Sequence, residues 1–365
     1  MALTAENLKA NDPDLINVES FRRAMLNWYK ENARRLPWRA VFGDKPDPYH
    51  EWLSEIMLQQ TVVKAVIPYF LKFTELWPTI HDLANAPQED VMREWAGLGY
   101  YARARNLHKC AQMISKEYQG KFPEEEAELK KLPGIGPYTA AAIMGISFEK
   151  PSVVMDGNIE RVLVRVFGHK KPVRESKKEV YAYAAHLSEG RTDYPGEYAQ
   201  GLMDLGAMIC TPISPKCGMC PIRAFCKARS ENIQETLPVK AKKISRPVKY
   251  GTLYFIENSK GELLLEKRPG TGLLGSMVGV PGSEWMDKPA DIAGKLEKFQ
   301  INHTFTHFHL ILDGVSLSEK DKSVMADKEY FWMRPDTYGK IGLPTVFKKS
   351  IKLYLQLKYK DKWIL

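Results

Sequence analysis

The chain has 365 residues, 44% of them hydrophobic, so it is long enough for two domains with buried cores. No stretch approaches the ~20 consecutive apolar residues that span a bilayer, and the polar residues 2–17 lack the pattern of a secretory signal, so a soluble cytoplasmic protein is expected. A net charge of +9 and a pI of about 9.1 favour a polyanionic partner, with nucleic acid preferred to membrane because no basic amphipathic helix stands out.

Residues 19–230 are predicted to form a mainly helical region, preceded by a flexible polar N-terminus of residues 1–18. Apolar side chains recur there at helical spacing, and clusters of proline and glycine separate the periodic segments. Helices are predicted at residues 21–30, 49–60, 63–76, 89–96, 103–118 and 157–167. This pattern indicates an N-terminal region built from packed helices.

The composition changes after residue 230. Residues 231–248 are basic and interrupted by prolines, which predicts a linker between domains that is able to contact phosphates. In residues 249–365 the apolar period shortens to that of strands. Strands are predicted at residues 252–256, 262–267 and 303–315, with a hairpin turn at 258–261 and a last helix at 345–357. The second domain is therefore expected to be α+β.

The five cysteines are unevenly distributed, with Cys110 alone and the others in a Cys-x6-Cys-x2-Cys-x5-Cys pattern at Cys210, Cys217, Cys220 and Cys226. An odd number with one tight group indicates a metal centre in a reducing compartment rather than a set of disulfides. Thiolates suit both zinc and iron–sulfur clusters, but zinc ribbons usually pair two Cys-x2-Cys units. One such pair in a short loop favours one [4Fe–4S] cluster over zinc.

Residues 132–140 place two glycines in a short turn between predicted helices. Gly134 and Gly136 let the backbone bend and approach a phosphate closely, and the helix that begins near Pro137 offers free N–H groups to an anion. The turn alone is a weak signal for a clamp on a nucleic-acid backbone. It gains weight from Asp156 further along, where an apolar run meets a helix. This residue is a helix N-cap or a reactive carboxylate, and the two roles are compatible.

A second carboxylate lies on an apolar helix face. Glu55 has Trp52 three residues before it and Leu58 three residues after it, with Ile56 adjacent. A carboxyl group among apolar side chains has a raised pKa and can act as an acid near neutral pH. On position alone, a solvated glutamate on an amphipathic helix would be the commoner outcome.

Together these motifs resemble the endonuclease III and MutY superfamily of DNA glycosylases. The cysteine spacing is similar to that of the superfamily's cluster loop, residues 132–140 resemble its helix–hairpin–helix element, and residues 51–61 resemble the signature of the MutY family, which removes mispaired adenine. The resemblance covers nearly the whole chain beyond residue 19. It implies a helix–hairpin–helix glycosylase fold with an iron–sulfur loop at residues 210–226 that is not the reaction centre.

The resemblance also implies roles for the two carboxylates. Glu55 would protonate N7 of adenine, which is otherwise a poor leaving group, and would then activate water. Asp156, oriented by Asn158, would stabilise or briefly trap the cationic sugar, in parallel with two-carboxylate glycoside hydrolysis. Tyr138 stands where bifunctional relatives carry the lysine that forms a Schiff base. A monofunctional glycosylase that leaves an abasic site is therefore expected.

Other positions of the family surround the flipped base and its partner strand. An aromatic group, a cation and an amide line the adenine pocket, whereas polar and aromatic side chains wedge into the base stack. The pocket residues are Trp38, Arg39 and Gln200, and the DNA-contacting residues are Gln60, Thr61, Tyr100, Gly134 and Gly136. For Trp38, core packing is the alternative role.

Residues 249–365 resemble the C-terminal domain of the MutY family, which is similar to Nudix hydrolases. The glutamate-rich box that holds metal in a working Nudix enzyme is absent, because the chain offers only Glu284, Asp287 and residues 295–298 in its place. A reader of 8-oxoguanine without hydrolase activity is therefore expected. The family's lesion-reading turn corresponds to Phe305, Thr306 and His307.

If residues 303–315 form a continuous strand, then His303, His307 and His309 share one face. A zinc site is the alternative chemistry for these three histidines. It ranks below lesion recognition and below a plain surface strand, because no carboxylate accompanies them.

The expected partner is double-stranded DNA with A:8-oxoguanine or A:G mispairs, bound by a monomer. Three other functions agree less well with the sequence. An endonuclease III-like lyase is disfavoured by Tyr138 and by the second domain. A MutT-like nucleotide hydrolase fused to a DNA-binding module is disfavoured by the missing glutamate box. A non-catalytic iron–sulfur DNA sensor is disfavoured by the presence of both Glu55 and Asp156.

Overall fold

The computed structural model describes residues 16–188, 190, 193–240, 245–270, 272–289, 298–319, 328–334, 337–338 and 341–359. Most of the predicted N-terminal segment 1–18, residues 241–244 of the predicted linker and residues 295–297 of the altered Nudix box lie outside the described residues. The chain divides into two compact units, of residues 1–84 with 109–243 and of residues 85–108 with 244–365. No helix among the described residues is long and apolar enough to cross a membrane.

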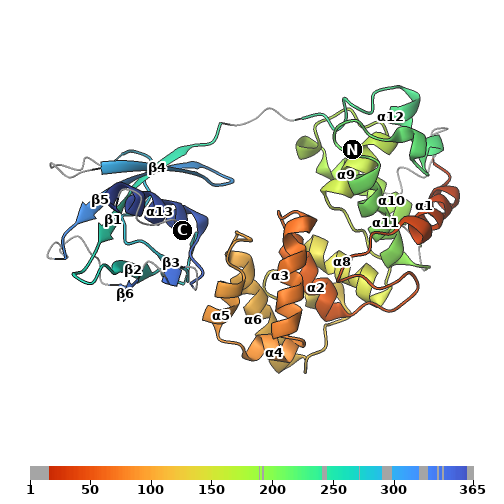
Figure 1. Ribbon diagram of the computed structural model, residues 1–365. Coiled ribbons are helices and arrows are strands. Elements are labelled where there is room, and N and C mark those ends of the chain that lie inside the picture. Colours follow the sequence, from red (N-terminus) through yellow and green to blue (C-terminus); the bar gives the residue numbers. More distant parts are fainter. Residues whose placement is uncertain are drawn as a thin grey trace. The chain divides into compact units, whose positions relative to one another are not determined.

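The first unit is built from helices (Figure 1). They are α1 (Val18–Asn32), α2 (Pro48–Leu58), α3 (Val63–Leu76), α4 (Ile80–Asn85), α7 (Glu126–Leu129), α8 (Pro137–Phe148), α9 (Gly157–Val166), α10 (Lys177–Ser188), α11 (Pro195–Met208) and α12 (Lys227–Ser230), and α6 (Ala102–Glu117) ends in this unit. Together with α5 (Gln88–Glu94), they include all six segments predicted to be helical.

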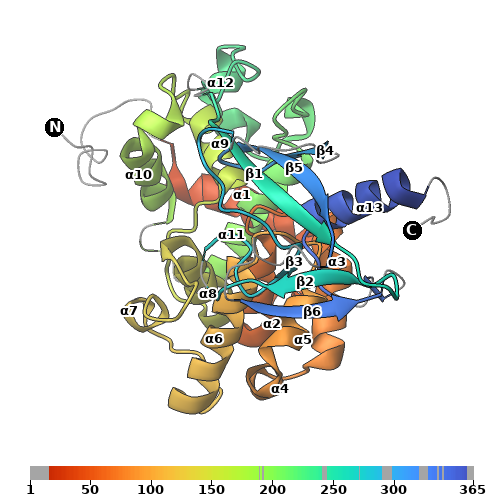
Figure 2. The same cartoon turned by 90° about the vertical axis from the view of Figure 1, so that its left-hand side faces the viewer.

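Helix α11 organises the first unit, because it packs against α1, α8 and α9. Small residues allow these close approaches. A side chain at Gly196 would collide with the backbone of Ile146 in α8, and one at Gly206 would collide with Asn158 at the start of α9. Helix α2 in turn packs on α3 and α8, as both views of the ribbon show (Figures 1 and 2). Helix α8 is thereby held between α2 and α11, and α9 packs on α11.

The second unit has an α+β fold, as predicted. One sheet has the order β1-β5-β4, with β1 parallel to β5, and the other is antiparallel with the order β3-β2-β6. The strands are β1 (Val248–Ile256), β2 (Leu263–Lys267), β3 (Val278–Gly279), β4 (Lys298–Thr304), β5 (His309–Leu317) and β6 (Glu329–Met333). Helix α13 (Thr345–Tyr359) contacts both sheets, because Phe347 lies on Gly279 and Tyr354 stacks on Phe255.

The predicted hairpin at residues 258–261 is wrong in its pairing. The turn itself forms, since the N–H of Gly261 donates to the carbonyl of Asn258. The strands on either side then diverge into different sheets after one bridge between Glu257 and Leu263. Strand β1 pairs instead with β5 along its full length, and this non-local pairing overrides the local signal.

Residues 303–315 are not one continuous strand. The chain turns at residues 305–308 between β4 and β5, where the N–H of Phe305 donates to the carbonyl of Phe308 at 2.9 Å. His303 therefore lies in one strand, His307 in the turn and His309 in the next strand. Among the described residues, no three His, Cys, Asp or Glu side chains are placed to hold a single metal ion. The geometric basis for a zinc site at the histidines is thus lost.

Candidate active site

A cavity of about 680 Å³ opens among the helices of the first unit. Its walls come from α2, the starts of α8 and α9, one face of α11 and the loop before α2. The predicted site residues that line it are Trp38, Arg39, Glu55, Gln60, Thr61, Tyr138, Asp156, Asn158 and Gln200. The packing of four helices thus brings together residues that lie far apart in the sequence.

The local sequence of α2 fixes the position of Glu55. Asp47 caps this helix by accepting a hydrogen bond from the N–H of Tyr49 at 2.8 Å, and Pro48 occupies the first turn. Trp52 and its apolar neighbours anchor the helix in the core, so that Glu55 is only 5% exposed although it borders the cavity. The carboxyl is therefore not a solvated surface group.

Burial is the main cause that raises the pKa of Glu55 to about 7. A hydrogen bond from the Tyr138 hydroxyl lowers this pKa, the nearby Asp156 carboxylate raises it, and the charge of Arg39 lowers it. Burial also raises the pKa of Tyr138 well above its usual value, so the hydroxyl stays protonated and remains a donor. Glu55 is thus suited to hold and release a proton near neutral pH.

Asp156 is the N-cap of α9 and also borders the cavity. Its Oδ1 accepts hydrogen bonds from the N–H groups of Asn158 and Ile159 at 2.9 and 2.7 Å, and its Oδ2 accepts one from the Asn158 side chain at 2.8 Å. The predicted capping role is confirmed. Because both oxygens are held by the start of the helix, the carboxylate has one defined orientation in the cavity.

Arg161 holds Asn158 in place. Its guanidinium donates to the side-chain oxygen of Asn158 at 2.9 Å, to the carbonyl of Gly206 at 2.7 Å and to the carbonyl of Cys210 at 2.8 Å. The absence of a side chain at Gly206 leaves the room that Asn158 occupies. The orientation of Asp156 therefore depends on the end of α11 and on the first cysteine of the loop.

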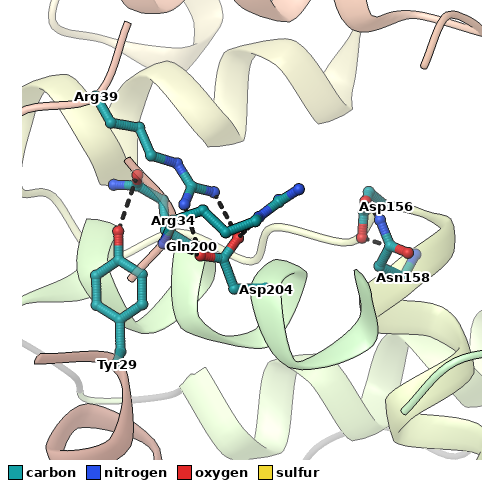
Figure 3. A network of polar contacts seen from close by, with 7 residues as sticks. All are labelled: Tyr29, Arg34, Arg39, Asp156, Asn158, Gln200 and Asp204. Atoms are coloured by element: carbon teal, nitrogen blue, oxygen red, sulfur yellow. Dashed lines mark hydrogen bonds and ion pairs between the residues drawn. The ribbon is translucent and has the colours of Figure 1, made fainter. Parts of the chain in front are cut away.

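A second polar network fixes Arg39 (Figure 3). Asp204, on α11, has a fully buried side chain and accepts hydrogen bonds from both terminal nitrogens of Arg39 at 2.7 and 2.9 Å. Arg34 adds one bond from its side chain at 2.7 Å and one from its backbone N–H at 2.9 Å. Sequence analysis did not identify Asp204 or Arg34. Each side chain takes its role from a partner 165 or more residues away.

Gln200 lies one turn before Asp204 on the same helix and borders the cavity. Its carbonyl oxygen accepts a hydrogen bond from the Tyr29 hydroxyl at 3.2 Å. Burial, the largest of several effects, raises the pKa of Tyr29 to about 12, so the hydroxyl persists as a donor. The amide nitrogen of Gln200 is then the group left for a ligand. Trp38 is a wall of the cavity and also a packing residue, edge to face with Phe70 at 5.3 Å.

The two glycines of the turn before α8 are required for different reasons. Gly134 has a φ of 81°, which only glycine adopts without strain. Gly136 is the N-cap of α8 in an extended conformation, and an added Cβ would meet no protein atom within 4 Å. A side chain at Gly136 would therefore not strain the backbone, but it would fill the space in front of the helix. This is expected where another molecule approaches the start of the helix.

The two predicted wedge residues share an unusual backbone. Gln60 follows the end of α2 with a φ of 59°, and Tyr100, in the second unit, has a φ of 49°. Both are exposed, and non-glycine residues in this region are uncommon and often functional. Thr61 lies beside Gln60 at the mouth of the cavity. The Tyr100 hydroxyl forms a hydrogen bond with that of Thr306, within the second unit.

The predicted lesion-reading residues form the turn between β4 and β5. Phe305 packs against Trp285 and Phe308 with ring centroids 5.5 and 5.0 Å apart. Thr306 and His307 are exposed at the tip of the turn. The aromatic cluster therefore holds the base of the turn and presents two polar side chains to solvent.

Asp287 of the altered Nudix box and Glu266 of β2 are engaged in ion pairs within the second unit. Asp287 forms an ion pair with Lys249 at 2.7 Å. Glu266, on β2, is fully buried between Arg268 and Lys328, with ion pairs of 3.2 and 2.8 Å. These carboxylates balance cations of the fold.

The four clustered cysteines line one further cavity of the first unit, beside Arg165, and none is in a disulfide. Arg165 is buried and donates to the sulfur of Cys210 at 3.3 Å and to the carbonyls of Thr211 and Leu237. Four thiols around a cavity fit a cubic cluster, which needs a ligand at each iron, better than a single ion. The cation of Arg165 is placed to offset the negative charge of such a cluster.

Comparisons with known proteins agree with this geometry. Residues 53–188 match the HhH-GPD superfamily of base excision DNA repair proteins, residues 210–230 match the iron–sulfur binding domain of endonuclease III, and residues 252–353 match the NUDIX domain. The adenine DNA glycosylase of Buchnera aphidicola subsp. Baizongia pistaciae is 34% identical over 348 residues, which cover 91% of this chain and 95% of that protein. The chain belongs to the adenine DNA glycosylase family.

Other relatives match parts of the chain. The human adenine DNA glycosylase is 41% identical over 231 residues, 61% of this chain and 42% of that protein. The solved structure of a thermostable thymine-DNA glycosylase matches 59% of this chain and 97% of its own, with 26% identity and a TM-score of 0.51. Family membership confirms the helix–hairpin–helix fold, the iron–sulfur site and the Nudix-like second domain. The roles of single residues stay predictions.

Proposed function

We propose that the protein is a monofunctional glycosylase that removes adenine opposite 8-oxoguanine or guanine in duplex DNA and leaves an abasic site. One observation carries this proposal. The cavity holds a buried carboxyl whose pKa is about 7, Glu55, together with a second carboxylate, Asp156, while Tyr138 and not a lysine stands beside them. Tyr138 cannot form a Schiff base, so hydrolysis without strand cleavage is the chemistry that this set supports.

In the proposed reaction the deoxyadenosine nucleotide flips out of the stack into the cavity. Glu55 gives its proton to N7, and the N-glycosidic bond breaks as its electron pair moves onto the protonated base, which leaves as neutral adenine. The Asp156 carboxylate stabilises the resulting sugar cation. Glu55, now ionised, takes a proton from a water molecule whose oxygen bonds to C1′ of the sugar. The products are adenine and an abasic site, and Glu55 is protonated again.

The other residues of the cavity wall position the flipped adenine. Trp38 offers a face for the base, and the amide of Gln200 and the guanidinium of Arg39 add polar groups to the adenine pocket. Outside the cavity, the turn at Gly134 and Gly136 binds a phosphate at the start of α8. Asn158 orients Asp156 and does not contact the DNA. The other DNA-contacting residues of the proposal are Gln60, Thr61 and Tyr100.

We further propose that the second domain reads the lesion, with Phe305 supporting Thr306 and His307 as hydrogen-bonding groups. The proposal includes action as a monomer in the cytoplasm. It also includes the domain boundaries set out above, with a glycosylase region at 19–230, a linker at 231–248 and the reader at 249–365. The exposed tip of the turn supports this role.

The test is a glycosylase assay on end-labelled duplexes with adenine opposite 8-oxoguanine, quenched with and without hot alkali. We expect an intact strand that breaks only after alkali, and no covalent complex with borohydride. Glu55→Gln and Asp156→Asn should both be inactive while they still bind the duplex. Strand cleavage without alkali or efficient borohydride trapping would support a lyase instead. Turnover near wild type in either variant would refute the assigned roles.

A further inference from the structure

Glu51 is a second buried carboxyl in the cavity wall that the proposed reaction does not use. It lies on α2 one turn before Glu55, so the two side chains emerge from the same helix face. Glu51 is only 3% exposed, and it borders the cavity. Its carboxyl has no hydrogen bond or ion pair with any residue that the structure describes.

The cation that acts on Glu51 is already engaged. Arg39 lies close enough to Glu51 to act on its charge, but both terminal nitrogens of Arg39 are bonded to Asp204. Burial, and then the charge of Glu55, raise the pKa of Glu51 well above its usual value, against the opposing effect of Arg39. A buried carboxyl without a partner avoids the cost of desolvating its charge by keeping its proton. A neutral carboxyl then offers one donor and one acceptor to the cavity.

We propose that Glu51 is a specificity residue that pairs with the Watson–Crick edge of the flipped adenine, its O–H donating to N1 and its carbonyl accepting from the N6 amine. This rests on the proposed function, in which Glu55 contacts N7. The Watson–Crick edge of adenine carries one acceptor and one donor side by side, and it is free once the base has left the duplex. While Glu55 contacts N7, the carboxyl of Glu51 one helical turn away can contact the Watson–Crick edge.

A role through Glu55 is the competing explanation. The groups that set the pKa of Glu55 are its own burial, Tyr138, Asp156 and Arg39. A neutral Glu51 adds no charge to this set. Direct contact therefore predicts that the shape and hydrogen-bonding pattern at position 51 matter, whereas a charge effect predicts that any neutral residue there behaves alike.

The experiment compares Glu51→Gln with Glu51→Met on DNA containing adenine, purine or 1-deazaadenine opposite 8-oxoguanine. Glutamine keeps one donor and one acceptor, whereas methionine has similar length and neither group. We expect methionine to lower kcat/KM on adenine by roughly 5- to 150-fold, the discrimination of one bidentate base contact, and glutamine to recover most of that loss. Purine lacks the N6 amine and 1-deazaadenine lacks N1, so each analogue removes one of the two contacted groups. On each of them the advantage of the wild type over Glu51→Met should be smaller than on adenine.

Glu197→Met is the matched control, because Glu197 is a buried carboxyl of α11 outside the cavity lining. In this variant kcat/KM should depend on N1 and N6 of the base as it does in the wild type, even if the variant is less stable. Binding of each variant to a duplex with an abasic-site analogue shows that it is folded. The proposal is overturned if Gln and Met are equally impaired, or if Met and the wild type depend equally on N1 and N6. A wild type inactive on adenine would instead refute the proposed function.

Discussion

The rate of base release should fall as the pH rises through about 7, because the reactive form of Glu55 carries the proton. Burial raises the pKa of this carboxyl to about 7, so the group is mostly protonated below that value and mostly ionised above it. At one pH unit above the pKa about one tenth of the acid form remains, and at two units about one hundredth. The rate on a saturated complex should fall in the same proportion.

Replacing Tyr138 by Phe should move this profile to higher pH. The Tyr138 hydroxyl donates to the Glu55 carboxylate and lowers its pKa, so its loss raises that pKa. A hydrogen bond to a charged group contributes about 1.5–3 kcal/mol, and 1.36 kcal/mol corresponds to one pKa unit. The midpoint should therefore rise by about one unit or somewhat more, and the variant should keep a larger share of its plateau rate in mild alkali.

The assay is single-turnover adenine release with enzyme in excess, from about pH 5.5 to 9.5 at constant ionic strength, so that the measured step is chemistry. Tyr183→Phe is the matched control. Its ring stacks on Phe167 at 4.1 Å and does not border the cavity, so the midpoint should not move. A rate that increases with pH, or a midpoint that is the same in Tyr138→Phe and the wild type, would contradict the assignment of Glu55 as the acid.

Four further outcomes are expected. Asp156→Asn should slow adenine release by roughly 100-fold or more while stability changes little, because asparagine still caps α9 but cannot balance a cation; chemical denaturation and single-turnover rates check both parts. Iron and sulfide analysis should give about four of each per chain, also in Cys110→Ser, and zinc without iron would refute the cluster. Asp204→Asn should lower the free energy of unfolding by about 3–5 kcal/mol, because it leaves Arg39 buried without its partner. Thr306→Ala with His307→Ala should weaken the preference for A:8-oxoguanine over A:G in binding, with little change in the rate of the saturated complex.

The helices were predictable because their signals are local. Asp47 with Pro48 marks the start of α2, and Asp156 marks the start of α9, each within a few residues of the apolar pattern that it opens. The same locality explains the error in the second domain. Asn258 and Gly261 specify that the chain turns, and this turn forms. They carry no information on which strand becomes the neighbour of β1, and that neighbour lies more than fifty residues away.

The supporting residues of the cavity were not predictable for a related reason. In the sequence Asp204 is an acidic residue among apolar ones. Only the fold shows that two arginines donate hydrogen bonds to it. Tyr29 acquires its partner Gln200 across 171 positions. Glu51 did carry a usable signal, because it precedes Glu55 by one helical turn. Its consequence depends on burial and on the absence of a hydrogen-bond partner among the described residues, which the spacing does not reveal.

The charges of the buried carboxyl groups around the cavity are compensated in two different ways. The difference explains how Glu55 can remain a proton donor beside a buried arginine. Around Asp204, opposite charges meet at 2.7 Å and compensate one another, so this cluster stays charged and rigid. At Glu55, and still more at Glu51, burial outweighs the attraction of the arginine, and the groups keep their protons instead. If Asp204 did not engage the terminal nitrogens of Arg39, that cation would be free to pair with these carboxyls and would lower their pKa values. On this argument the buried ion pair contributes to catalysis by keeping the cation away from the acid.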